Sequence, residues 1–112
     1  MYLFTYRARV NPKSETATKY RDFGGAYVSC YVSFKDYEGA EALAKFYIRD
    51  EGWIPEKKVD ESKVQKKWCK KKLEKQLYSE AIKYGYSMIF NMWRKDAKDA
   101  EVDYEAKRKK GR

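Results

Sequence analysis

Residues 24–53 have the sequence GGAYVSCYVSFKDYEGAEALAKFYIRDEGW, and this stretch decides the fold. From Ala26 the residues alternate between two sides, which is the period of a half-buried strand. One side is apolar and holds Ala26, Val28, Cys30, Val32 and Phe34. Asp36 can then cap a helix that Gly52 can end in the left-handed conformation. The apolar stripe of this helix consists of Ala40, Leu43, Ala44, Tyr47 and Ile48, so the stretch predicts a strand followed by a helix that packs on it.

The remaining elements follow outward from this stretch. Residues 2–10 alternate in the same way and predict a strand, and the polar residues 11–23 predict a surface connection. Residues 53–59 and 63–68 suggest two short strands, although residues 63–69 could instead begin the next helix. That helix has the stripe Leu73, Leu77, Ala81 and Tyr84, and Gly85 is its natural end. Residues 86–93 are apolar on both sides and predict a strand inside the sheet.

Residues 26–93 therefore have the order strand, helix, strand, strand, helix, strand, which is the order of a ferredoxin-like βαββαβ core. We predict an α+β domain over residues 1–94, with one sheet and both helices on one face of it. The additional N-terminal strand should lie beside the last strand, because the first core strand of this fold already has two neighbours. Residues 95–112 are highly charged and predict a marginally helical or disordered basic tail.

Charge is distributed unevenly along the chain of 112 residues, which has a net charge of +9. Residues 1–62 hold ten Lys/Arg and ten Asp/Glu, whereas residues 63–112 hold sixteen and seven. Such an excess in one half favours a polyanion, an acidic protein or an anionic surface as a partner. The two cysteines are far apart, and the sequence has neither a signal peptide pattern nor an apolar run of membrane-spanning length. We therefore expect a cytoplasmic protein with reduced thiols that does not enter a membrane.

Groups that could carry catalysis are scarce. The chain has no histidine, which removes the usual general base and the usual metal ligand. It also has no glycine-rich phosphate loop between a strand and a helix. Cys69 lies in a lysine run that could activate its thiol, but no base and no second cysteine accompany it. The sequence predicts a protein that is not an enzyme and uses no metal or other cofactor.

Lysines dominate residues 63–75, where seven lysines stand against the single acid Glu74. If this segment is helical, its lysines form a basic ridge, which is either a solvated surface or an anion-binding site. A basic C-terminal end could add phosphate contacts. The residues that we predict to contact phosphates in these two segments are Lys66, Lys67, Lys70, Lys71, Lys107, Arg108, Lys109 and Lys110.

A second candidate surface is the sheet face that the helices leave open. If it carries the odd-numbered residues of the first two strands, it presents Arg7 and Arg9 beside Tyr27 and Tyr31. Tyrosines beside arginines are typical of platforms for single-stranded nucleic acid. The glycine and aromatic motif of RNA-binding sheets is absent. The same face could instead form a homodimer or bind another protein, because Ile89 and Trp93 are unfavourable in water.

Overall fold

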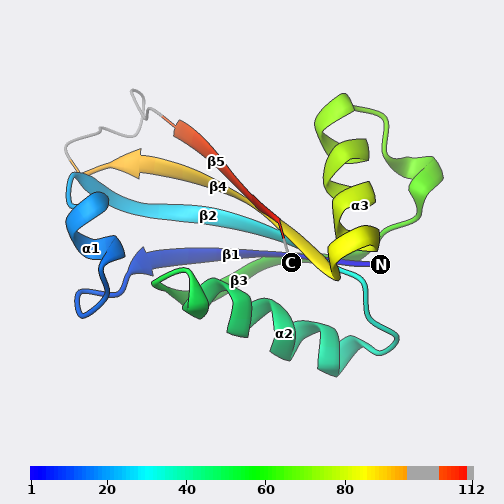
Figure 1. Ribbon diagram of the computed structural model, residues 1–112, viewed down its shortest axis with the longest axis horizontal. Coiled ribbons are helices and arrows are strands. Elements are labelled where there is room, and N and C mark those ends of the chain that lie inside the picture. Colours follow the sequence, from blue (N-terminus) through cyan, green and yellow to red (C-terminus); the bar gives the residue numbers. More distant parts are fainter. Residues whose placement is uncertain (96–103, 111–112) are drawn as a thin grey trace.

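The computed structural model describes residues 1–95 and the backbone of residues 104–110. Over this part of the chain the strands form one antiparallel sheet in the order β3-β1-β2-β4-β5 (Figure 1). The predicted α+β class is confirmed. In chain order the elements are β1 (Tyr2–Val10), α1 (Thr16–Lys19), β2 (Phe23–Val32), α2 (Tyr37–Asp50), β3 (Trp53–Lys63), the 3-10 turn η1 (Lys66–Trp68), α3 (Lys72–Tyr84), β4 (Tyr86–Arg94) and β5 (Tyr104–Lys110).

The local signals around the two long helices are confirmed. Asp36 caps α2, and its carboxylate accepts a hydrogen bond of 2.7 Å from the Gly39 backbone N–H. Gly52 and Gly85 follow α2 and α3 with φ angles of 87° and 94°, in the left-handed region that glycine adopts without strain. These boundaries fix the lengths of both helices and therefore the positions at which the chain returns to the sheet.

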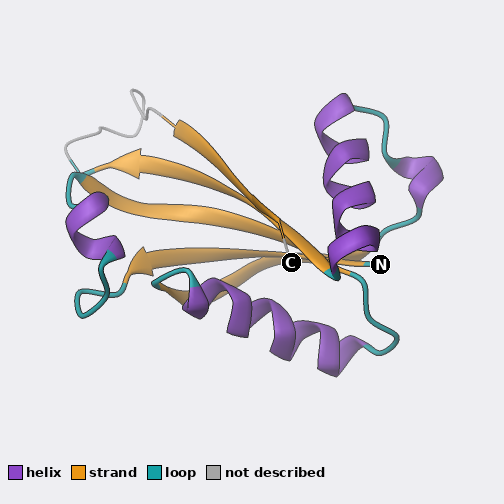
Figure 2. Ribbon diagram, in the orientation of Figure 1, coloured by secondary structure: helices purple, strands orange, loops and turns teal. Residues whose placement is uncertain are grey.

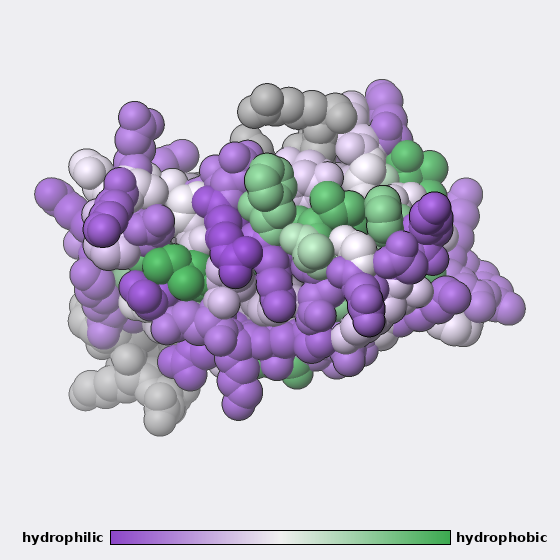
Figure 3. Space-filling model, turned by 90° about the horizontal axis from the view of Figure 1, so that it is seen from below, coloured by the Kyte–Doolittle hydropathy of each residue, from purple (hydrophilic) through white to green (hydrophobic). Residues whose placement is uncertain are grey.

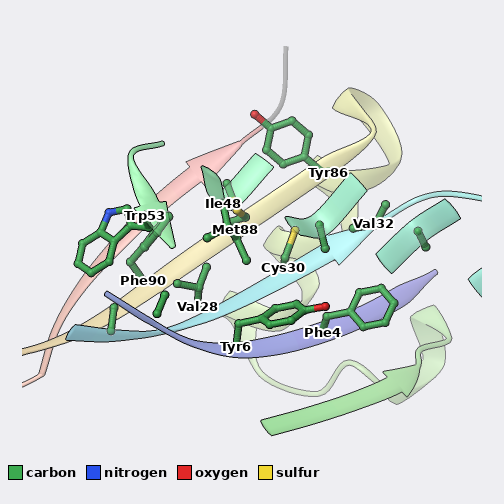
Figure 4. Close-up of a cluster of buried hydrophobic side chains, with 14 of the residues drawn as sticks. Phe4, Tyr6, Val28, Cys30, Val32, Ile48, Trp53, Tyr86, Met88 and Phe90 are labelled. Carbon is green, nitrogen blue, oxygen red and sulfur yellow. The ribbon is translucent and has the colours of Figure 1, made fainter. Parts of the chain in front are cut away.

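The two long helices cover opposite faces of the sheet (Figure 2). On one side, which we name the α2 face, Ile48 of α2 packs against the buried side chains of the strands (Figure 4). On the other side, the α3 face, Leu77 and Ala81 pack on Tyr31 and Ile89. The prediction that both helices lie on one face is wrong, because the odd-numbered side of β2 and β4 is also apolar where α3 contacts it. Among the described residues, no helix covers the rest of the α3 face.

The strand order corrects the predicted ferredoxin-like arrangement. Residues 53–63 form the single strand β3, and residues 66–68 form η1, so the predicted short strand over 63–68 does not exist. The N-terminal strand takes the position beside β2 that the missing strand would have occupied. It pairs with β2 from Tyr2↔Val32 to Ala8↔Ala26 and with β3 on its other side. The N-terminal strand is therefore an inner strand between β3 and β2 and not an addition beside the last one.

The C-terminal segment also differs from its prediction. Residues 104–110 form β5, which pairs antiparallel with β4 from Trp93↔Tyr104 to Ser87↔Lys110, so the predicted helical or disordered tail is wrong there. Residues 96–103 and 111–112 of the predicted tail lie outside the described residues. Residues 104–110 form a strand because β4 otherwise has a free edge, and a further strand can satisfy the unpaired N–H and C=O groups of that edge. Lysines are common on such edge strands, where they discourage further pairing.

Candidate functional site

The uncovered part of the α3 face brings together Arg7 of β1, Tyr27 of β2 and Trp93 of β4. Arg7 and Tyr27 are directly paired across the two strands. The Arg7 guanidinium carbon lies over the Trp93 ring at 5.4 Å from its centroid, and the Tyr27 and Trp93 ring centroids are 5.2 Å apart. Arg7 is exposed, and the two rings are partly exposed. We name these three residues the aromatic platform. Sequence reasoning identified Arg7 and Tyr27 but not Trp93 as their neighbour.

The aromatic platform depends on a close approach of Trp93 to the backbone of β2. Gly25 pairs with Trp93, and a Cβ at Gly25 would lie only 2.5 Å from the Trp93 ring and 2.9 Å from the Ala8 carbonyl oxygen. Real Cβ atoms do not come this close to other atoms. The indole therefore lies across the glycine, where any larger residue would lift it from the sheet. The absence of a side chain at Gly25 therefore leaves the space in which the Trp93 ring packs on the sheet.

Basic side chains gather at the end of the sheet nearest Trp93. A hollow of about 220 Å³ there is lined by Arg9, Arg21 and Lys95 together with apolar residues. Arg9 also forms an exposed ion pair of 3.1 Å with Glu56, so it is partly neutralised. Arg21 and Lys95 were missed from sequence, because neither lies in the lysine-rich segments or in the alternating part of a predicted strand. Their positive charges give the aromatic platform a basic border at this end.

The predicted lysine residues form a second basic border at the other end of the α3 face. Lys66 and Lys67 lie in η1, and Lys70 and Lys71 precede α3, so the predicted helical ridge is wrong. All four are exposed, and within residues 1–95 none of them forms an ion pair. The segment lies on the α3 side because Val64, just before it, packs with Leu3 and Tyr31. Trp68, which is 54% exposed among these lysines, was missed as a candidate contact.

Tyr31 is not available for stacking. It is 5% exposed, because α3 covers it, and burial raises the pKa of its hydroxyl to about 12. The prediction that it belongs to the open face is therefore wrong. Ile89 is covered by the same helix and is 8% exposed, so it gives no reason for this face to dimerise.

Four of the predicted phosphate contacts lie in β5 at the edge of the sheet. The strand register places Lys107 opposite Phe90, Arg108 opposite Ile89, Lys109 opposite Met88 and Lys110 opposite Ser87. The basic end is therefore an edge strand beside the aromatic platform, since Tyr104 pairs with Trp93.

The two cysteines carry no activated thiol. Cys69 is buried, and this burial, followed by the negative charge of Glu74, raises the pKa of its thiol despite the surrounding lysines. Cys30 lies in the core of the α2 face, and burial raises its pKa as well. Within the described residues no three His, Cys, Asp or Glu side chains are grouped to hold a metal ion. The thiolate form is therefore disfavoured at both positions near neutral pH.

A cluster of charged and hydroxyl groups joins β3 to α2 on the α2 face. The Lys58 ammonium lies 2.6 Å from Glu41, 2.8 Å from Glu61 and 2.7 Å from the Tyr37 hydroxyl. The Tyr6 hydroxyl donates a hydrogen bond of 3.1 Å to Glu41, and the Tyr37 hydroxyl donates one to Glu61. The hydrogen bond from Lys58 is the main reason why the pKa of Glu41 and that of Glu61 are lowered. The groups satisfy one another, so this cluster connects elements and leaves no group poised for proton transfer.

The lowered pKa values predict that this cluster stabilises the fold less in acid. A carboxylate whose pKa is lower in the folded chain contributes stability above its unfolded pKa, and that contribution disappears as the pH falls through the folded value. For Glu41 the loss should begin near its ordinary value of 4.5 and increase below it. From neutral pH to pH ~3, the unfolding free energy of Glu41→Gln should therefore fall by less than that of the unmodified chain. Urea denaturation of both chains at the two pH values measures this difference. An equal loss in both chains would contradict the assigned role of Glu41.

Comparison with protein-family models, curated proteins and solved structures finds no match for this chain. Among the described residues, no helix is long and apolar enough to cross a membrane. The surface chemistry of the α3 face is therefore the main indication of what the protein binds.

Proposed function

We propose that this protein is a non-enzymatic binding module that holds single-stranded nucleic acid on its α3 face. The observation that supports the proposal most strongly is the aromatic platform of Arg7, Tyr27 and Trp93 between two basic borders. Bases stack on aromatic rings and on arginine guanidinium planes, and lysines meet the phosphates. Arg7 lies over Trp93 and extends the stacking surface beyond the ring.

A single strand fits this surface better than a duplex. The bases of a duplex are stacked on one another, so they cannot stack on the exposed rings and would add little binding energy. Unpaired bases can stack on the rings directly. α3 covers Tyr31 and Ile89 between the lysine segment and the aromatic platform, so the strand would run past α3 from the lysine segment to the platform and on toward Arg9, Arg21 and Lys95. Every base has an aromatic face, so we expect little dependence on sequence.

The test is a fluorescence anisotropy titration of the full chain with a labelled single-stranded oligonucleotide and with its duplex. We expect tighter binding of the single strand, and Tyr27→Ala should weaken it by roughly 5- to 100-fold, which is the usual value of one stacked base. Phe46→Ala is the matched control, because Phe46 is an exposed aromatic residue of α2, on the other side of the sheet. Circular dichroism spectra should show that both variants fold.

Two results would overturn the proposal. One is an equal loss of affinity in Tyr27→Ala and Phe46→Ala, and the other is the absence of oligonucleotide binding at low salt. In the second case, a sedimentation mass that rises with protein concentration would favour the alternative drawn from the sequence, a homodimeric or protein-binding role of the sheet face.

A further inference from the structure

A second surface, on the opposite side of the molecule, has the chemistry of a cation site. A hollow of about 380 Å³ is lined by Phe46, Tyr47, Asp50, Tyr84 and Tyr86, and we name it the aromatic hollow. Its residues come from the second half of α2 and from the junction between α3 and β4. Figure 3 views the molecule from the α2 side and shows apolar side chains gathered among hydrophilic ones. Of the residues that line the hollow, four are aromatic and one is a carboxylate.

The rings of the hollow hold a fixed geometry. Tyr47 and Tyr86 are stacked with ring centroids 3.6 Å apart and planes 13° apart, and Phe46 meets Tyr47 edge to face at 5.7 Å. Tyr86 belongs to the core cluster and is 9% exposed, and its ring lies at the edge of the cluster (Figure 4). Phe46 is 59% exposed, so most of its ring remains in water and contributes little to the core. A ring held in place but left in water is available to a ligand.

The charge around the hollow favours a cation. Asp50 lines it, and Glu51 is the next residue along the chain. The pKa of Tyr86 is raised, first by burial and then by the negative charge of Glu51 and Asp50 among others, so the field of these carboxylates reaches the hollow. Aromatic faces are themselves negative and attract cations. The Tyr84 ring already has a cation of the chain beside it, because the Lys83 ammonium lies 5.2 Å from its centroid, so Tyr84 is not counted among the ligand contacts.

We propose that the aromatic hollow binds an alkylated ammonium group, with Phe46, Tyr47 and Tyr86 contacting its methyl groups and Asp50 balancing its charge. A metal ion would need several oxygen ligands, and this hollow has one lining carboxylate. An unmodified ammonium ion is compact and strongly hydrated, and it would lose its water to rings that give no hydrogen bonds in return. A methylated ammonium is weakly hydrated and is the cation that aromatic sites typically recognise.

The test is an NMR titration of the full chain with choline and with 3,3-dimethylbutan-1-ol. This alcohol is the neutral analogue of choline, in which a carbon atom replaces the nitrogen. Choline should shift the resonances of Phe46, Tyr47 and Tyr86, and the neutral analogue should bind roughly 2- to 30-fold more weakly, because it has the shape but not the charge. Phe46→Ala and Asp50→Asn should each weaken choline binding. Tyr27→Ala is the control and should leave it unchanged, since Tyr27 lies on the α3 face.

Equal binding of choline and dimethylbutanol would overturn the proposal, as would shifts that map away from the hollow or no binding of either. A peptide that carries trimethyllysine distinguishes the two sources of the group. If the peptide binds at least tenfold more tightly than choline, the ligand is a modified protein side chain. If the peptide and choline bind with similar affinity, the ligand is a free small molecule. This site is independent of the proposed nucleic acid site, because Tyr27→Ala and Phe46→Ala separate the two.

Discussion

Replacing Lys66, Lys67, Lys70 and Lys71 together by alanine is expected to remove most of the salt dependence of oligonucleotide binding. If each lysine neutralises one phosphate of a single strand, the four contribute about −2.8 to the slope of log affinity against log salt. Raising the salt from about 50 to 200 mM should then weaken the unmodified chain by roughly 50-fold. The variant should bind more weakly at both salt concentrations and keep only the smaller slope that Arg9, Arg21 and Lys95 contribute. Anisotropy titrations of both chains at the two concentrations measure this difference.

The control separates the position of the charges from their number. A second variant should replace Lys13, Lys35, Lys45 and Arg49, which are four positive residues outside the lysine segment, so its net charge equals that of the first. It should keep most of the salt slope. The first variant should fold normally, because all four lysines are exposed and the N-terminal hydrogen bond of α3 uses the Lys71 backbone N–H, which donates to Glu74 at 2.9 Å. Equal slopes in the two variants would mean that net charge, and not this segment, attracts the oligonucleotide.

Local patterns in the sequence predicted the elements that depend on near neighbours. The cap at Asp36, the stripe that buries Ala40, Ala44 and Ile48, and the strand at residues 86–93 are all present. Each signal arises within a few residues of the element that it defines, so no knowledge of the rest of the fold was required. The two-sided apolarity of β4 even indicated correctly that this strand lies inside the sheet with both faces at least partly covered.

The order of the strands could not be predicted in the same way. The pairing of β3 with β1 shifts register between Thr5 and Tyr6 and again between Arg7 and Ala8. Each shift inserts a residue into β3 and breaks its alternation. The polar residues Asp60, Glu61 and Ser62 are typical of a turn, so one strand looked like two short ones on either side of them. The extra predicted strand then left no room for β1 beside β2. The wrong division of one edge strand therefore changed the predicted topology of the whole sheet.

The candidate site was also predicted only in part, because local patterns indicate some of its residues and contacts between distant segments decide the others. Arg7 and Tyr27 were expected together, and they do pair, because strand alternation alone places them on one face. Tyr31 follows the same alternation but is covered, since α3 packs on that face. The contact between Trp93 and Gly25 joins two strands that lie far apart in the sequence, and no local pattern indicates it. In the C-terminal segment, charge pairs at helical spacing suggested a helix, but the unpaired edge of β4 favours a strand.

Ile48→Ala should destabilise the protein by about 2–5 kcal/mol, which is the usual cost of truncating a fully buried isoleucine. Ile48 is 0% exposed and packs between α2 and the sheet with Val28, Cys30 and Met88 of the same cluster. Alanine would remove its contacts and leave a cavity, because the strands beneath α2 are fixed by their ladder hydrogen bonds and cannot close the gap. Urea denaturation should show a lower midpoint with an unchanged slope, which indicates a loss of stability without a change in the compactness of either state.

Ile82→Ala is the matched control for this prediction, because Ile82 is an isoleucine of α3 that is 59% exposed. Its removal should change the unfolding free energy by less than about 0.5 kcal/mol, and the better helix propensity of alanine offsets part of any loss. The aromatic platform and the aromatic hollow lie on opposite sides of the core that Ile48 fills, so both surfaces depend on the same packing. Equal destabilisation by the two variants would mean that α2 does not supply the main core. It would also mean that neither surface is held in the arrangement from which its ligand is inferred.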